Sequence, residues 1–310
     1  MPNTTVKNIL ILSIIIIPFL FSGCSIKSMA LNGVGDALSG GGTTFTSDND
    51  PDLIKDALPF ALKMYESVLD GVPEHKPLTL ATAKTFAMYA YAFLQIEAER
   101  IDKEDFEKAK TLRLRAKKLY LRGRDYALRG LELNHFGFKE ALNKDYKAAI
   151  ANTNKDDVGL LYWCGASWVA ALTTDKSDFQ LLTDSAIGAA MIQRVLELDE
   201  SFDDGSAHEF FISWDGSRSE AMGGSEKRAR EHFARVIELS KGKKAGTYIS
   251  LATSVCINRQ NSAEFIDLLN KALAIDVDKY PENRLTNIIM QKRAKWLLDN
   301  IDDFFLGEEQ

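Results

Sequence analysis

Helical periodicity extends over nearly the whole chain after residue 50 and constrains the fold more than any other feature of the sequence. Apolar residues recur there at spacings of three and four, which places them on one face of an α-helix. The longest series runs from Phe106 to Leu133 and keeps this spacing for about seven turns. Shorter series occupy residues 54–68, 86–96, 161–168, 182–196, 229–237, 249–256, 265–272 and 285–296. No comparable alternating strand pattern occurs, so the sequence predicts an all-α domain.

Several of these helices carry spacings that resemble the tetratricopeptide repeat (TPR). The second TPR helix ends with Ala, an aromatic residue four positions on, a small residue three further on, and Pro five beyond that. Ala61, Tyr65, Val68 and Pro73 reproduce this spacing. Weaker matches are Gly188-Ile192-Val195, Ala229-Phe233-Val236 and Phe265-Leu269-Ala272. Because their offsets differ from the strict repeat of about 34 residues, we expect a superhelical array of antiparallel helix pairs with degenerate TPR-like repeats.

The first 24 residues predict export and lipidation. Lys7 precedes an apolar run from Ile9 to Phe21, which is shorter than the roughly 20 residues that span a bilayer and is typical of a signal peptide. The following Ser22-Gly23-Cys24 resembles a lipobox, in which the cysteine is lipidated and becomes the mature N-terminus. We expect residues 1–23 to be a lipoprotein signal peptide and Cys24 to carry the lipid. An ordinary secretory signal with an incidental cysteine is the alternative.

Composition changes near residue 50 and predicts a domain boundary there. Residues 24–50 are rich in Gly, Ser, Thr, Asn and Asp, which is typical of a flexible tether. Asp50 suits a helix N-cap and Pro51 the first helical position. We therefore expect a lipidated tether over 24–50 and a single TPR-like helical domain over 51–310. Ser25 after the lipidated cysteine favours anchoring in the outer membrane of a bacterium, with the domain facing the periplasm.

Charge and motif searches exclude several classes of function. A net charge of −6 argues against nucleic acid as the main partner. The four histidines are far apart and no H-E-x-x-H motif occurs, so no metal, cofactor or catalytic residue is predicted. Cys164 and Cys256 lie in stretches that predict buried helix, and an oxidising compartment would permit a disulfide only if the fold brought them together.

A few polar and aromatic residues are candidates for binding a ligand or a partner. His208 and Glu209 form the best polar pair and could hold an organic anion; the alternative is that they brace two helices. Trp163 and Trp168 share a predicted helix but, five residues apart, diverge on its surface. Either both belong to the core, or one is core while the other lines a cavity.

A basic stripe is predicted along the long helix over 106–133. Arg115, Lys118, Arg122 and Arg129 fall on one face of it. Such a stripe could meet an acidic partner, anionic lipid headgroups or a carboxylate ligand. The alternative is an ordinary solvated face.

Taken together, several segments resemble one family, the T component of TRAP transporters (the TatT lipoproteins). The matching segments are residues 38–42, 45–51, 57–63, 89–93, 162–163, 202–209, 222–225, 238–246 and 291–298. The resemblance implies an all-helical lipoprotein with cryptic TPR motifs that forms a homotrimer with a pore or groove. It further implies a partner, the periplasmic substrate-binding P component, and ligands that are small organic acids or hydrophobic molecules.

The sequence therefore favours a non-enzymatic, membrane-anchored accessory subunit of a solute transporter. Two other functions compete with it. An envelope scaffold for protein assembly would use the concave surface that TPR arrays offer to extended peptides. A helical-toroid hydrolase would need buried carboxylates, among which Glu209 is the candidate.

Overall fold

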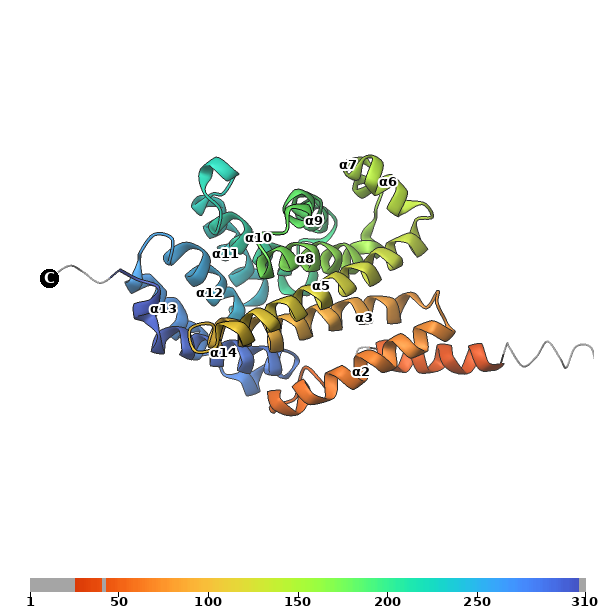
Figure 1. Ribbon diagram of the computed structural model, residues 1–310, viewed down its shortest axis with the longest axis horizontal. Helices are drawn as coiled ribbons and strands as arrows, with labels where there is room; N and C mark the ends of the chain where they lie inside the picture. The colour runs from red at the N-terminus through yellow and green to blue at the C-terminus, as the bar shows by residue number, and fades with distance from the viewer. Residues whose placement is uncertain (1–25, 41–42, 307–310) are drawn as a thin grey trace, which may run out of the picture.

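The computed structural model describes residues 26–40 and 43–306; over them it contains helices joined by turns and loops and no strand, which confirms the predicted all-α class. Figure 1 shows the arrangement. The α-helices after residue 50 are α2 (Pro51–Gly71), α3 (Lys76–Tyr89), α4 (Ile96–Ile101), α5 (Phe106–Asn134), α6 (Phe138–Lys144), α7 (Tyr146–Ala151), α8 (Val158–Thr174), α9 (Phe179–Asp199), α10 (Ser206–Gly216), α11 (Glu226–Ser240), α12 (Ala245–Leu251), α13 (Ser262–Leu273) and α14 (Arg284–Asp299). The shorter elements include the π-helix η1 (Ala90–Gln95) and the 3₁₀ turn η4 (Glu220–Met222).

Helix ends follow the local chemistry of the sequence. The α2 helix begins at Pro51, as predicted, and the Asp50 side chain accepts hydrogen bonds from the backbone N–H groups of Asp52 and Leu53, both at 3.1 Å. The long apolar series is one helix, α5, of 29 residues. The α8 helix, which packs against α5, is almost wholly apolar in sequence and is buried along most of its length.

The helices form two halves that share one hydrophobic core. In the N-terminal half α5 packs against α3 and α8, and α8 in turn packs against α9. In the C-terminal half α10 packs against α11 and α12, and α13 packs against α12 and α14. Figure 1 shows α12, α13 and α14 at one end of the layered helices α3, α5 and α8. A single cluster of buried side chains extends from Ile54 in α2 to Leu297 in α14 and joins the two halves.

Two glycines let α8 and α9 approach closely. A Cβ atom on Gly165 would lie 2.5 Å from the carbonyl oxygen of Gly188, closer than real Cβ contacts. Larger residues at either position would therefore separate the two helices.

The segment expected to be a tether is partly ordered. Residues 26–39 form a helix, whose Leu31 and Leu38 pack on the buried cluster that contains Leu69. Asp36 Oδ1 lies 3.1 Å from Nε2 of the buried His75. The structure thus differs from the expected flexible tether, because two leucines spaced seven residues apart give this glycine-rich segment an apolar face. Cys24 lies outside the described residues.

Further along the same segment, the chain is fastened to the start of α14. The carbonyl oxygen of Thr46 accepts a hydrogen bond from the Leu285 N–H at 2.9 Å, and that of Ser47 accepts one from Arg284 Nη1 at 3.1 Å. Packing therefore begins before the predicted boundary at Pro51.

Most positions of the TPR-like spacings are buried, Ala61, Tyr65 and Val68 among them. This agrees with a role in helix packing, while the TPR arrangement itself stays a prediction. No helix among the described residues combines the length and hydropathy needed to cross a membrane.

Candidate functional site

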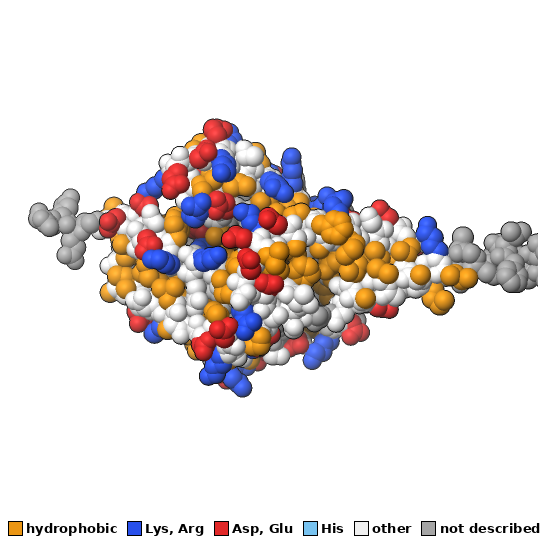
Figure 2. Space-filling model, turned by 90° about the horizontal axis from the view of Figure 1, so that it is seen from below, with side chains coloured by type: hydrophobic (Ala, Val, Ile, Leu, Met, Phe, Trp, Pro, Cys, Tyr) orange, Lys and Arg blue, Asp and Glu red, His pale blue; other side chains and the backbone are white. Residues whose placement is uncertain are grey.

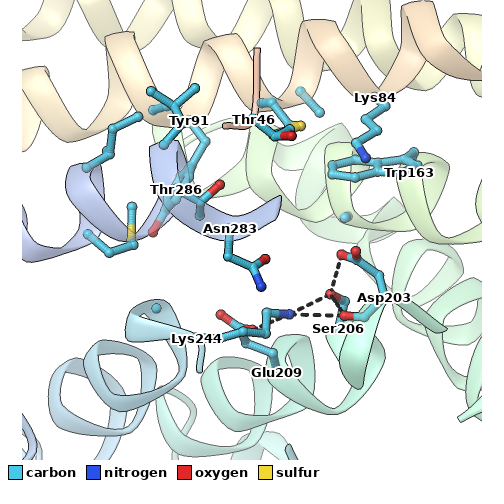
Figure 3. Close-up of a pocket in the computed structure, with 18 of the residues that line it drawn as sticks. Thr46, Lys84, Tyr91, Trp163, Asp203, Ser206, Glu209, Lys244, Asn283 and Thr286 are labelled. Carbon is cyan, nitrogen blue, oxygen red and sulfur yellow. Dashed lines mark hydrogen bonds and ion pairs between the residues drawn. The ribbon is translucent and has the colours of Figure 1, made fainter. Parts of the chain in front are cut away.

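A cavity of about 340 Å³ lies where the two halves meet. The N-terminal half contributes α3, η1, α5 and α8, and the C-terminal half contributes α10, α12 and α14. Figure 3 shows the lining side chains converging from both halves. The volume suits a small organic molecule.

A π-helical turn shapes one wall of this cavity. Tyr91, Ala92 and Phe93 line the cavity from η1, which interrupts the long helical run from α3 into α4. A π turn adds one residue to the helical repeat and so changes which side chains face inward; such turns occur frequently at functional sites.

The wall formed by the N-terminal half carries several aromatic side chains among smaller apolar ones. Besides Tyr91 and Phe93 it contains Tyr162 and Trp163, whose ring centroids are 5.1 Å apart in an edge-to-face contact. Lys84 Nζ lies 5.8 Å from the centroid of the Trp163 ring. Burial raises the pKa of the Tyr91 hydroxyl, so this hydroxyl stays neutral. This wall offers flat apolar surfaces and one amine.

The C-terminal half supplies the polar floor, which centres on Lys244. Its Nζ lies 3.0 Å from Glu209 Oε2, 2.9 Å from Ser206 Oγ and 3.2 Å from the Asp203 carbonyl oxygen. Burial alone would lower the pKa of Lys244, but the charges of Glu209 and Asp203 outweigh it and the pKa is raised. Lys244 is thus a fixed ammonium group.

Two polar groups on the cavity lining are buried and have no hydrogen-bond partner within the described part of the chain: Ser167 Oγ and Asn283 Nδ2. The Asn283 side chain points into the open space toward Lys244 in Figure 3. Buried polar groups in native proteins are nearly always paired. These two groups therefore mark positions where a bound molecule or water completes the hydrogen bonding.

Of the residues predicted for binding, Trp163 and Glu209 line this cavity. Trp168 instead is buried, and its ring lies 4.9 Å from the Arg124 guanidinium carbon. One tryptophan is therefore core and the other lines a cavity, which is one of the two arrangements expected from their five-residue spacing.

His208 points away from its neighbour Glu209. Its Nδ1 lies 2.8 Å from Nδ1 of His232 on α11, and its Nε2 lies 3.4 Å from Glu200 Oε2. Burial lowers the pKa of both imidazoles, and the neighbouring His208 lowers that of His232 further. His208 thus braces α10 against α11, the alternative considered for it, while Glu209 faces the cavity.

The residues of the basic stripe, including the candidate binding residues Arg115 and Arg122, do not line the cavity. Arg115 is exposed. Arg122 forms an ion pair with the buried Glu66, and its guanidinium carbon lies 5.1 Å from the Phe86 centroid. Arg122 therefore joins α5 to α2. The basic stripe is not a continuous row of unpaired charges, because Arg122 within it is already paired with Glu66.

Both cysteines of the helical domain are free and buried. Burial raises the pKa of the Cys164 thiol, and it raises that of Cys256 to about 12. They behave as small apolar residues. In the described part of the chain no cluster of His, Cys, Asp or Glu side chains could hold a metal ion.

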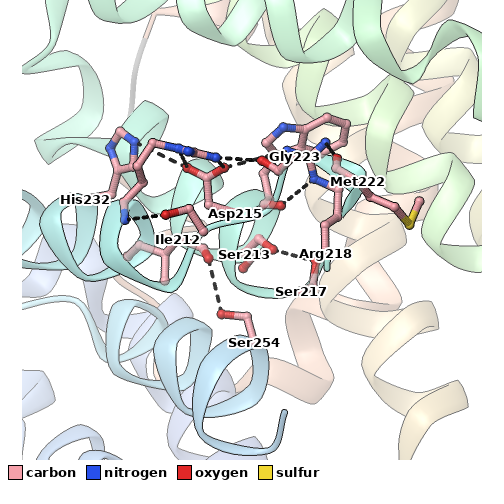
Figure 4. Close-up of polar contacts among 12 residues, drawn as sticks. Ile212, Ser213, Asp215, Ser217, Arg218, Met222, Gly223, His232 and Ser254 are labelled. Atoms are coloured by element: carbon pink, nitrogen blue, oxygen red, sulfur yellow. Dashed lines mark hydrogen bonds and ion pairs between the residues drawn. The ribbon is translucent and has the colours of Figure 1, made fainter. Parts of the chain in front are cut away.

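A second polar cluster holds the loop that includes η4. Asp215 is buried and accepts hydrogen bonds from Arg228 Nε at 3.0 Å and Nη2 at 2.8 Å. Arg218 donates from Nη1 to the Met222 carbonyl oxygen at 3.0 Å (Figure 4). Because every charged group in it is paired, this cluster stabilises the α10–α11 connection.

Sequence reasoning missed the central residues of the cavity, Lys244 and Asn283. Each is the residue just before a helix, α12 and α14 respectively. Nothing in a single sequence distinguishes them from other polar residues at helix starts, because the cavity exists only where distant helices meet.

The fold and the cavity define an all-helical protein with an internal site lined by aromatic groups on one side and by polar, partly unpaired groups on the other. Its family is given by comparison with known proteins: the family model described as TRAP transporter T-component matches residues 47–305. The chain belongs to this family, as its resemblance predicted. It is also 32% identical over 305 residues to a protein of Treponema pallidum (strain Nichols) described as uncharacterized, covering 93% of this chain and 94% of that one. The family is a transporter accessory component and not a family of enzymes.

Proposed function

We propose that this protein is a membrane-anchored, periplasmic accessory subunit of a TRAP-type transporter that docks the substrate-binding P component and takes up a small ligand in its central cavity. The family match over residues 47–305 supports the transporter role. The lipobox-like Ser22-Gly23-Cys24 supports the anchor, and Ser25 after it supports the outer membrane as its location. The cavity between the two halves is the observation that supports ligand uptake.

The ligand is an organic acid with an apolar body. Trp163 and Tyr91 offer surfaces for the apolar part. Asn283 Nδ2 offers an unpaired donor to a carboxylate, and Lys84 Nζ also lines the cavity. The N-termini of α10 and α14 border the same space, and their positive dipole ends favour an anion.

A titration of the purified mature protein with apolar carboxylic acids and with their methyl esters tests the ligand. We expect the acids to bind, and Lys84→Met to weaken their binding about tenfold while leaving any ester binding unchanged. Lys76→Met is the matched control, since Lys76 is exposed at the start of the same helix. Equal binding of acids and esters would exclude the carboxylate as the recognised group.

Docking is tested separately by sedimentation of the mature protein with the substrate-binding protein encoded beside it. A complex of defined mass is expected. Two species that sediment independently at micromolar concentrations, with and without ligand, would rule out this partner.

We also propose that the chain forms a homotrimer and that its helix pairs are degenerate TPR units arranged as a superhelix. The trimer is what the resemblance to the T-component family implies, and the burial of the Ala61, Tyr65 and Val68 positions supports the repeats. Sedimentation equilibrium distinguishes a trimer from a monomer directly, and a monomer across the accessible concentration range would reject it.

A further inference from the structure

The helix over residues 26–39 has one packed face and one exposed apolar face. Leu31 and Leu38 face the body of the protein. On the other side Ile26 and Met29 are 61% and 69% exposed, and Val34, between the two faces, is 44% exposed. Figure 2 shows apolar side chains gathered along this narrow end of the molecule, up to the point where the described chain begins.

The position of this helix along the chain identifies what covers its exposed face. Cys24 precedes Ile26 by two residues, and two residues span at most about 7 Å. A lipid on Cys24 would therefore bring the first helical turn to the membrane surface. The helix carries only two charges, Lys27 and Asp36, and Lys27 near its start suits anionic headgroups.

We propose that Ile26 and Met29 insert into the interfacial region of the membrane and that the domain rests directly on the lipid surface, with no flexible spacer. This inference rests on the proposed lipidation of Cys24. Because Asp36 contacts His75 and Leu31 packs beside Gly71, the helix is fixed to the domain. Insertion of its first turn therefore also fixes the orientation of the whole domain on the membrane.

The test is a depth measurement on the lipidated protein reconstituted in vesicles. An environment-sensitive fluorophore is attached to Met29→Cys, and vesicles are prepared with and without brominated acyl chains. The native Cys164 and Cys256 are buried, so labelling is selective for the introduced thiol. Met222→Cys is the matched control, because Met222 is similarly exposed, at 63%, in η4 of the distant α10–α11 connection.

We expect a blue-shifted emission and about twofold quenching by brominated lipid at residue 29, because interfacial groups lie 5–10 Å into the boundary of the acyl chains. No change is expected at residue 222. Flotation of the same samples separates the two proposals. Protein that fails to float disproves the lipid anchor and, with it, the insertion of Ile26 and Met29. Protein that floats while residue 29 stays in water disproves the insertion alone.

A second copy of the chain is the competing occupant of this face. It is tested with labelled Met29→Cys in the unlipidated Cys24→Ser background without vesicles. Emission that is independent of protein concentration supports the membrane as the occupant. A blue shift that grows with protein concentration would assign the face to a contact between copies and overturn the proposal.

Discussion

The ion pair between Arg293 and Glu99 joins α14 to the N-terminal half. Breaking it should lower the free energy of unfolding by more than is usual for a solvent-exposed ion pair. Arg293 on α14 donates to Glu99 on α4 through Nε at 2.8 Å and Nη2 at 3.0 Å, and through Nη1 to the Tyr91 hydroxyl at 3.2 Å. The side chain of Arg293 is only 14% exposed. Glu99→Gln removes the counter-charge and leaves a largely desolvated guanidinium group with only neutral hydrogen-bond partners such as the Tyr91 hydroxyl.

We expect Glu99→Gln to lower the free energy of unfolding by about 2 kcal/mol. This is below the 3–5 kcal/mol typical of breaking a fully buried pair, because a third of the Glu99 side chain is exposed and water can partly replace it. The matched control is Glu97→Gln, two residues away on α4. Glu97 pairs with Arg100, which is 47% exposed and three residues along the same helix, so the control should cost at most about 0.5 kcal/mol.

Urea unfolding followed by circular dichroism at neutral pH measures both changes. The double variant Arg293→Met with Glu99→Leu should recover most of the loss, because it removes the uncompensated charge and keeps apolar volume. Equal costs for Glu99→Gln and Glu97→Gln would show that Arg293 is well solvated without its partner, and would refute the reasoning.

Three further changes have defined outcomes. Gly165→Ala should lower the unfolding free energy by about 2 kcal/mol, because its Cβ would meet the Gly188 carbonyl oxygen. Denaturant titration measures this change, and an unchanged unfolding free energy would mean that α8 and α9 can separate freely. Gly33→Ala should instead raise the melting temperature, since a Cβ there meets nothing within 4 Å. Alanine stabilises a helix by up to about 1 kcal/mol relative to glycine. An unchanged melting temperature would mean that residues 26–39 do not fold with the domain. Folding lowers the pKa of His208 and His232, so the unfolded state takes up protons first as the pH falls through about 6.5, and stability falls with it. Melting temperatures at about pH 7.5 and 5.5 should therefore differ more for the wild type than for a variant with glutamine at both positions, and an equal difference would contradict the stated cause.

The helices were predictable from the sequence because helical periodicity is a local property. The series from Phe106 to Leu133 and the Asp50-Pro51 helix start both appear in the structure as expected. The helix over residues 26–39 is not predictable in the same way, because the composition of this segment favours a flexible chain while its apolar residues are few. Gly, Ser and Asn predict a flexible segment, yet Leu31 and Leu38 have a partner surface on α2 and α3 that only the folded chain reveals.

The cavity was less predictable, since its two sides come from segments far apart in the chain. Neighbours along a helix lie about 100° apart around the axis, so His208 and Glu209 could not both face one site. Glu209 lines the cavity, whereas His208 contacts His232 and Glu200 instead. The interruption of the α3–α4 run by η1 also has no visible signal in the sequence, although it determines that Tyr91 and Phe93 face inward.

The division of chemistry between the two halves constrains how a ligand must be oriented. The aromatic groups come from the interior faces of α8 and η1, whose positions are fixed by the shared core. The polar groups Lys244 and Asn283 come from residues that precede α12 and α14, and Asn287 ties these two helix starts together by accepting from Ala245 N at 3.0 Å and donating to the Lys243 carbonyl oxygen at 2.9 Å. A ligand that contacts both sides must therefore orient its apolar part toward α8 and its polar end toward α14. A ligand held in this way would bridge the same two halves that the Arg293–Glu99 ion pair joins.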